Sequence, residues 1–174
     1  MLETERLTLR PLAEKDVDAI YAMRSDADVM RFIREPQDRS ESANWIDLVS
    51  SRWTSEKMGF CAMIEKSSEK FVGWCGLWQL KETGETEVGY AVAKEFWGKS
   101  YAAEAAKEFL TYAFEKLLCD KIVAVAQPAN AASRRVMEKL GMSYDYTDEF
   151  YGRDLVHYSV TKEKFKQDRQ DLQD

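Results

Sequence analysis

The sequence predicts an α+β fold: one domain with a mixed, mostly antiparallel sheet of about seven strands, flanked by helices on both faces. Three observations predict this class. Short segments of alternating apolar residues follow one another through residues 59–92 with brief turns between them, which is typical of an antiparallel meander. A strand, a helix and a further strand then span residues 87–126, and this order requires a parallel pairing. The length of 174 residues suits one such domain.

The N-terminal part predicts one strand and two helices. Residues 2–10 alternate apolar and polar side chains like a strand, which ends at Pro11. Residues 14–25 form an amphipathic helix, and an irregular stretch follows it. Ser40 is expected to cap a second helix. The buried side of that helix is expected to carry Trp45, Ile46, Val49 and Trp53.

The central part predicts three strands, a helix and a fourth strand. Residues 60–65, 71–80 and 85–92 are the meander. The helix covers residues 101–116, with a broad apolar stripe on one side and charged residues opposite. Residues 122–126 are continuously apolar, as in a buried strand.

The C-terminal part predicts a capped helix and a closing hairpin. Asn130 is a good N-cap, and Gly141 is suited to the residue just after the helix. Residues 143–150 and 155–160 form the hairpin. From about residue 162 the chain is a charged tail, expected to be a short helix that frays, and residues 1–174 form a single domain.

Composition excludes several classes of protein. A single histidine, His157, makes a histidine-based metal centre improbable, and three scattered cysteines fit neither a disulfide framework nor a zinc site. The net charge of −6 argues against nucleic-acid binding and slightly favours a cationic substrate. With no signal peptide and no apolar run of membrane-spanning length, we expect a cytoplasmic protein, either monomeric or homodimeric.

The segment 97–101, Trp-Gly-Lys-Ser-Tyr, links a strand to a helix and is a candidate anion site. The first amides of a helix lack partners within the helix, and the helix dipole adds positive potential there. A glycine-containing loop at this place therefore favours a phosphate or carboxylate ligand.

Several motifs together resemble the GNAT superfamily of N-acetyltransferases, most closely its RimJ/RimL-type branch. The motifs cover nearly the whole chain in the order expected for that family. They are Glu-Arg-Leu-Thr-Leu-Arg-Pro at 5–11, Glu-Val-Gly-Tyr at 87–90 with the loop at 97–105, Asn-Ala-Ala-Ser at 130–133 with the helix to Met142, and Tyr-Gly-Arg-Asp at 151–154.

The resemblance implies direct transfer of an acetyl group from acetyl-CoA to a primary amine, with no metal. It implies that Glu87 is the general base and that Ser133 protonates the departing thiolate. It also implies that the coenzyme contacts the loop, the preceding strand and the following helix. The implied coenzyme-binding residues are Val88, Tyr90, Val92, Trp97, Gly98, Lys99, Ser100, Tyr101, Ala102, Asn130 and Arg135.

The chain departs from the family pattern at three positions. Trp97 replaces a polar residue, Ser100 stands where glycine is usual, and Met137 occupies the place of a tyrosine that acts as the acid in many relatives. Serine tolerates positive φ less well than glycine, so we expect Ser100 to affect the affinity of the protein for the coenzyme.

Plainer roles remain open for each candidate. Glu87 fits an ordinary strand glutamate facing solvent, Asn130 a pure helix cap, and Trp97 a core residue. Arg134 and Arg135 fit either contacts to the coenzyme 3′-phosphate or surface charge, and the side chain of Lys99 is expected to point toward the anion.

The acceptor is not specified by any motif. The resemblance suggests a protein N-terminal α-amino group of the ribosomal-protein type, and a small-molecule amine is an equal alternative. The acceptor pocket is expected from residues 24–58 and the closing hairpin, with Phe32 or Trp78 as a wall. A second hypothesis is a non-catalytic acyl-CoA-binding sensor on the same fold.

Overall fold

The fold is built on one eight-stranded sheet, described in a computed structural model that covers residues 1–170. The strand order is β1-β2-β3-β4-β5-β6-β8-β7, and every neighbouring pair is antiparallel except β5 and β6. The strands are β1 (Leu2–Glu3), β2 (Leu7–Pro11), β3 (Phe60–Glu65), β4 (Phe71–Gln79), β5 (Thr86–Val92), β6 (Lys121–Ala126), β7 (Ser143–Phe150) and β8 (Arg153–Thr161). This confirms the predicted class, with the two-residue β1 as an additional strand.

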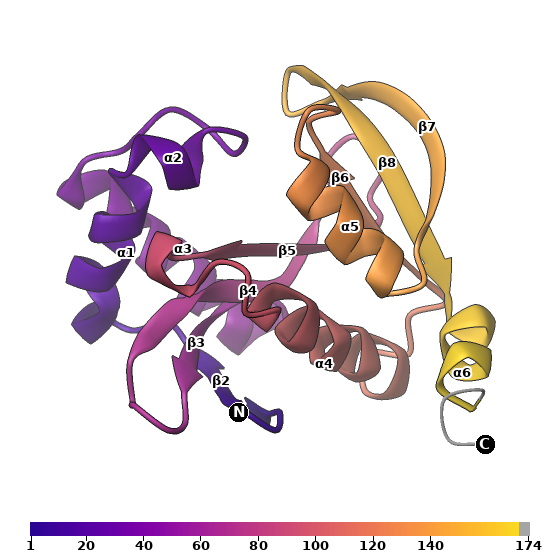
Figure 1. The fold of residues 1–174 in the computed structure, drawn as a ribbon, viewed down its shortest axis with the longest axis horizontal. Helices are drawn as coiled ribbons and strands as arrows, with labels where there is room; N and C mark the ends of the chain where they lie inside the picture. Colours follow the sequence, from indigo (N-terminus) through magenta and orange to yellow (C-terminus); the bar gives the residue numbers. More distant parts are fainter. Residues whose placement is uncertain (171–174) are drawn as a thin grey trace.

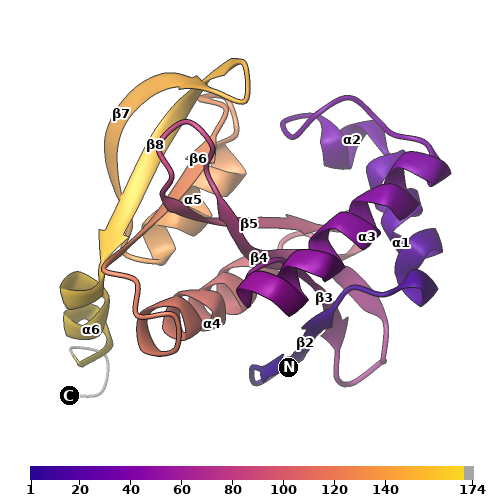
Figure 2. The same ribbon diagram turned by 180° about the vertical axis from the view of Figure 1, so that it is seen from behind.

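Helices cover both faces of the sheet, as predicted (Figures 1 and 2). The apolar stripe of α4 packs with residues of α5 and α6 on one face, while α1 and α3 form a second core on the other. The helices are α1 (Val17–Arg24), α2 (Ala27–Met30), α3 (Arg39–Glu56), α4 (Tyr101–Glu115), α5 (Ala131–Lys139) and α6 (Lys162–Gln170), and short 3₁₀ turns lie at Glu14–Asp16 and Lys94–Phe96.

Three helical details differ from the prediction or extend it. The N-cap of α3 is Asp38, not Ser40, because the Asp38 carboxylate accepts the Glu41 N–H while the Glu41 side chain accepts the Asp38 N–H. The stretch predicted to be irregular contains α2, capped by Asp26. The predicted tail helix is present as α6, and its Phe165 packs on Phe114 with ring centroids 5.2 Å apart. The last four residues lie outside the described residues.

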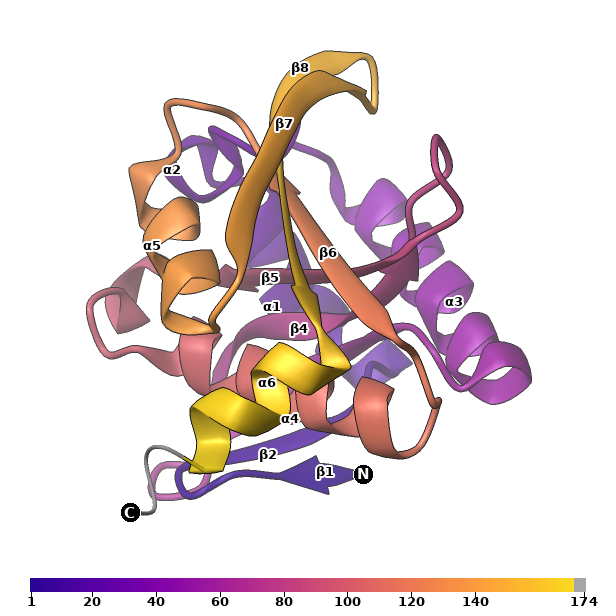
Figure 3. The ribbon, with the colours of Figure 1, turned by 90° about the vertical axis from the view of Figure 1, so that its right-hand side faces the viewer.

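The parallel strands β5 and β6 separate almost at once. They share a single paired position, Glu87 with Val123, and Figure 3 shows β6 running steeply across the direction of β5. The Ala93 N–H donates to Val72 of β4, so strand alternation directs the backbone groups of Tyr90 and Val92 to the opposite edge, toward β6. Beyond Glu87 this edge of β5 has no strand partner among residues 1–170.

The cysteines serve as small packing residues. All three are free, Cys61 and Cys75 are buried, and Cys119 is half-buried. Burial raises the pKa of the Cys61 thiol to about 12 and raises that of Cys75 as well. Neither thiol is therefore a nucleophile at neutral pH.

Candidate active site

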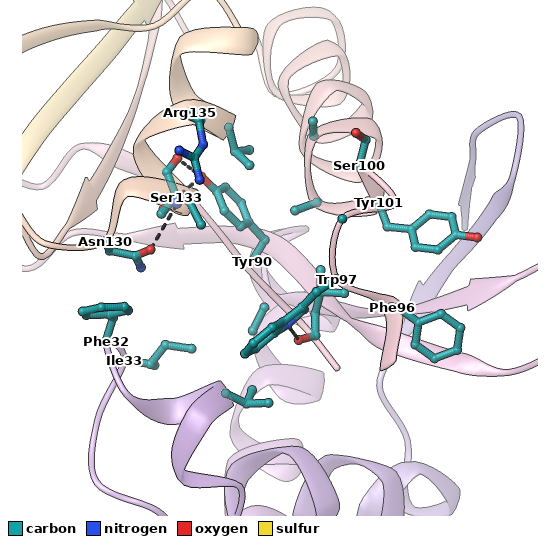
Figure 4. A pocket seen from close by; sticks show the side chains of 18 of the residues that line it. Phe32, Ile33, Tyr90, Phe96, Trp97, Ser100, Tyr101, Asn130, Ser133 and Arg135 are labelled. Atoms are coloured by element: carbon teal, nitrogen blue, oxygen red, sulfur yellow. Dashed lines mark hydrogen bonds between the residues drawn. The ribbon is translucent and has the colours of Figure 1, made fainter. Parts of the chain in front are cut away.

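Two clefts meet where β5 and β6 separate. The first, which we call the α4 cleft, has a volume of about 670 Å³ and is bounded by the loop before α4, the free part of β5 and the start of α5 (Figure 4). The second, which we call the aromatic cleft, has about 640 Å³ and lies over β3, β4 and the β7–β8 turn. Five residues line both clefts and join them: Phe32, Ile33, Tyr90, Asn130 and Ser133.

The loop before α4 has the backbone shape expected of an anion-binding loop. Gly98 has φ +79° and Ser100 has φ +63°, so both adopt the left-handed conformation. Ser100 is the N-cap of α4 but makes no side-chain cap hydrogen bond, and its backbone position is the one for which glycine is favoured. The loop and the first turn of the 15-residue α4 face the α4 cleft, as the sequence predicted.

Three cationic side chains line the α4 cleft: Arg31, Arg135 and Lys139. Arg135 was predicted from the sequence, whereas Arg31 and Lys139 were not. The spacing of four residues between Arg135 and Lys139 on one helix face was the available signal for Lys139. Arg31 is the C-cap residue that follows α2, a helix that the sequence does not predict. The acidic Asp28 in this cleft is paired with Lys94.

Two cations that the sequence offers for the coenzyme, Lys99 and Arg134, do not line the α4 cleft. The Lys99 Nζ lies 4.9 Å from the centroid of the Phe96 ring, and Lys99 does not line the cleft. Arg134 donates from Nε to the Tyr158 hydroxyl at 3.2 Å and from Nη1 to the Pro128 carbonyl at 3.3 Å. The expected orientation of Lys99 is therefore wrong, and Arg134 does not line the α4 cleft.

Trp97 lies in the α4 cleft and is not a core residue. It is 49% exposed, and Figure 4 shows its indole across the cleft below Tyr90. Its Nε1–H donates to the Val92 carbonyl at 2.7 Å. The indole thus occupies one of the backbone acceptors on the free edge of β5.

Tyr90, Asn130 and Ser133 form a hydrogen-bonded group at the junction of the clefts. The Asn130 Oδ1 accepts the Ser133 N–H at 3.1 Å, which is the predicted cap of α5. The Tyr90 hydroxyl lies 3.1 Å from the Ser133 Oγ and donates to the Ser133 carbonyl at 3.1 Å. Burial raises the pKa of Tyr90 above its ordinary value. Sequence reasoning placed Tyr90 at the coenzyme but missed this contact with Ser133.

Glu87 is a buried carboxylate at the floor of the aromatic cleft. It is 9% exposed, so the alternative of a solvent-facing strand glutamate is wrong. The Tyr151 hydroxyl donates to its Oε2 at 2.5 Å. Burial raises the pKa of Glu87 to about 7, the Tyr151 hydrogen bond opposes this, and the charge of Glu82 adds to it. A carboxylate with this pKa can accept a proton near neutral pH.

The walls of the aromatic cleft come from the segments predicted for the acceptor pocket and from two strands. Trp45 of α3 and Arg153 of the hairpin belong to the predicted segments, and both Phe32 and Trp78 line the cleft as expected. The aromatic residues of β3 and β4 were not predicted there, apart from Trp78. The lining rings are Phe32, Trp45, Phe60, Trp74, Trp78, Tyr90 and Tyr151.

The comparison with known families decides the assignment. The family described as "Acetyltransferase (GNAT) domain" matches residues 6–143, which is most of the chain. The chain belongs to the GNAT acetyltransferase family. It is therefore an acetyltransferase, and the GNAT family uses acetyl-CoA.

Several GNAT relatives are similar over most of their length. The uncharacterized N-acetyltransferase YnaD of Bacillus subtilis is 30% identical and is matched over 81% of each chain. The FsC-acetyl coenzyme A-N(2)-transacetylase of Aspergillus fumigatus is 29% identical over 94% of this chain and 77% of the relative. Among solved structures, an acetyltransferase from Agrobacterium tumefaciens is 26% identical with a TM-score of 0.82, covering 92% of this chain and 94% of that one.

Two further observations describe the part of the GNAT chain that the structure covers. No helix within residues 1–170 is both long and apolar enough to cross a membrane. Within the same residues, no group of three or more His, Cys, Asp or Glu side chains is arranged so that it could hold a metal ion.

Proposed function

We propose that this GNAT acetyltransferase moves an acetyl group from acetyl-CoA directly to a primary amine while both substrates are bound. The observation that carries the proposal is the position of Glu87. This carboxylate, whose pKa is about 7, lies in a cleft that opens onto the α4 cleft at Tyr90 and Ser133. An amine bound in one cleft can therefore reach a thioester bound in the other, with a base beside it.

The α4 cleft is assigned to acetyl-CoA. The amides of Gly98–Ala102 suit the pyrophosphate, because they open a helix and two of these residues have positive φ. The cations Arg31, Arg135 and Lys139 suit the phosphates of the same coenzyme. The pantetheine would pair with the free edge of β5 near Val88 and Tyr90, since the indole of Trp97 holds the Val92 carbonyl.

The proposed chemistry needs two proton transfers. As the amine nitrogen forms its bond to the acetyl carbon, the Glu87 carboxylate takes the proton that the nitrogen loses. A backbone N–H of β5 stabilises the carbonyl oxygen as it gains negative charge. When the carbon–sulfur bond breaks, the thiolate receives the proton of the Ser133 hydroxyl. Tyr90, 3.1 Å from Ser133 Oγ, is placed to return a proton to the serine oxygen, and Tyr90 regains its own proton from water.

The acceptor is a primary amine, either a protein N-terminal α-amino group or an amine on a small molecule. Fold similarity does not choose between them. A spermidine N-acetyltransferase from Vibrio cholerae and a ribosomal-protein-S5-alanine acetyltransferase from Vibrio fischeri share the fold with TM-scores of 0.76 and 0.77, at only 20% and 17% identity.

A second candidate function is a non-catalytic sensor of acyl-CoA. It is favoured by Met137, which is 1% exposed. This residue stands where many relatives carry the tyrosine that acts as the general acid. Both candidates predict calorimetric binding of acetyl-CoA. The test is release of free CoA across a panel of amines, followed by mass spectrometry of acetylated products from cell extract. Turnover on any amine supports the enzyme, whereas binding without turnover on every amine supports the sensor.

A further inference from the structure

The charged residues of the aromatic cleft are mostly cationic. Arg34, Lys81 and Arg153 line it, and Glu87 is the single acidic side chain among the described residues that do so. The chain as a whole carries a net charge of −6. The cleft is therefore locally positive although the protein as a whole is negative. The net charge favours a cationic substrate, whereas the charge of the cleft favours an anionic one.

These three cations have no carboxylate of residues 1–170 within the 4 Å of an ion pair. None of them forms an ion pair with another described residue, and Arg153 uses its Nη1 to donate to the Ile33 carbonyl at 3.3 Å. The nearby Glu82 accepts the backbone N–H of Tyr151 at 2.6 Å and does not line the cleft. Unpaired guanidinium and ammonium groups at the wall of a cleft favour an anionic group on the bound molecule.

The aromatic walls add a second preference. Phe60 stands between Trp45 and Trp78, with ring centroids 5.6 Å and 5.8 Å away respectively. The guanidinium of Arg24 lies 4.3 Å from the centroid of the Trp45 ring, and that of Arg52 lies 4.3 Å from the centroid of the Trp78 ring. The wall is thus apolar, and two of its rings already hold a cation. It suits an apolar or aromatic body rather than a second cation.

We propose that the acceptor is a small primary amine that carries a carboxylate or phosphate group on an apolar body, such as a free amino acid with an apolar side chain. This proposal rests on the proposed function, because it uses Glu87 as the base beside the amine. The anionic group would lie among Arg34, Lys81 and Arg153, and the body against the tryptophan rings. A polyamine would instead bring its remaining ammonium groups toward three cations.

The first experiment compares matched acceptors with the full-length protein and acetyl-CoA. Phenylalanine is paired with phenethylamine, and 2-aminoethyl phosphate with ethanolamine, so that each pair differs by its anionic group. Rates are referred to the unprotonated amine. We expect kcat/KM to be about tenfold higher for the anionic member of at least one pair. The pair that shows the larger ratio distinguishes carboxylate from phosphate.

The second experiment removes the cations one at a time. Arg34→Gln and Lys81→Gln are expected to lower the anionic-to-neutral ratio of kcat/KM by about tenfold. Arg153→Gln is expected to do the same, although its contact with Ile33 makes it the less clean variant. Lys107→Gln, which removes an exposed cation on α4 that lines neither cleft, is the matched control and should keep the ratio.

The outcomes separate this proposal from the proposed function. A neutral amine, spermidine or a tripeptide amide that matches or exceeds the anionic amines would overturn the acceptor class. Cation variants that leave the ratio at its original value would overturn the assignment of the cleft. If no amine is acetylated, calorimetry of phenylalanine and phenethylamine with the CoA-loaded protein decides. Tighter binding of phenylalanine would support the aromatic cleft as a site for an anionic amine and would overturn the proposed acetyl transfer. Equal binding of the two amines would overturn the acceptor class as well.

Discussion

Replacement of Glu87 by glutamine tests the proposed base through activity and stability together. The buried carboxylate has a pKa of about 7, against an ordinary value of 4.5. As a base it works only when ionised, so the catalytic advantage of the wild type should disappear as pH falls below 7. We expect Glu87→Gln to lower kcat/KM by about a hundredfold or more at pH 8.

The ratio of wild-type to variant activity is the informative quantity. The acceptor amine titrates in both proteins, and the ratio removes that contribution. The ratio should rise tenfold per pH unit below about 7 and level off above it. It is measured as CoA release between pH 5.5 and 8.5. A ratio that is constant across this range would refute Glu87 as the base, whatever the size of the loss.

The same substitution should stabilise the fold at high pH. Because the folded-state pKa of Glu87 is raised, the native state holds this proton more tightly than the unfolded chain does. The corresponding stability is full below about pH 4.5 and is lost as pH rises through 7. Between pH 5.5 and 8 the stability of Glu87→Gln relative to the wild type should increase by about 2 kcal/mol. Urea unfolding measures it, with the exposed Glu69→Gln as control, for which no such increase is expected.

Three further substitutions probe the loop, the acid and the hairpin. Ser100→Asp should weaken CoA binding by about tenfold, because it places a carboxylate where the pyrophosphate is assigned, and aspartate tolerates the positive φ; unchanged affinity in calorimetry would remove the loop from the site. Ser133→Ala should lower kcat by about tenfold or more in single-turnover experiments, and an unaltered kcat would leave protonation of the thiolate to water. His157→Phe should reduce the free energy of unfolding in urea by about 3 kcal/mol, since this buried ring lies 3.0 Å from Asp145 and 3.1 Å from Glu85; a loss below about 1 kcal/mol would mean that these contacts contribute little.

Local signals in the sequence predict much of the fold. Strand β3 has the predicted bounds, α4 begins at Tyr101 as expected, and Asn130 caps α5. Each depends on a few neighbouring residues, such as an alternating run or a cap before an apolar stripe. The start of α3 was misplaced because Asp38, Ser40 and their neighbours offer competing caps. The reciprocal bonds between Asp38 and Glu41 decide it.

The site can be predicted only where its residues are close together in the sequence. The loop of residues 97–102 and the pair Asn130–Ser133 are local, and the sequence predicts both. The bond between Tyr151 and Glu87 joins residues 64 positions apart, and nothing local indicates it. Cations are equally difficult to place, since a long side chain can turn either way, and Lys99 and Arg134 turn toward aromatic partners.

Met137 stands where many GNAT enzymes carry a tyrosine that acts as the acid. The separation of β5 and β6 shows which residue can take the place of that tyrosine. The two strands are paired only at Glu87 and Val123, so the proposed base lies at the apex of the gap. Further along, the Tyr90 hydroxyl crosses from β5 to Ser133 at the start of α5. A phenol therefore reaches, from the strand, the end of the site that we assign to the thiolate, while the helix position that usually supplies one is a buried methionine. The same contact ties α5 to β5 at the junction of the two clefts, so one tyrosine both supplies the hydroxyl and fixes the position of Ser133. The Tyr90 hydroxyl is therefore placed to supply what Met137 lacks, and this weighs against the non-catalytic alternative that Met137 favours.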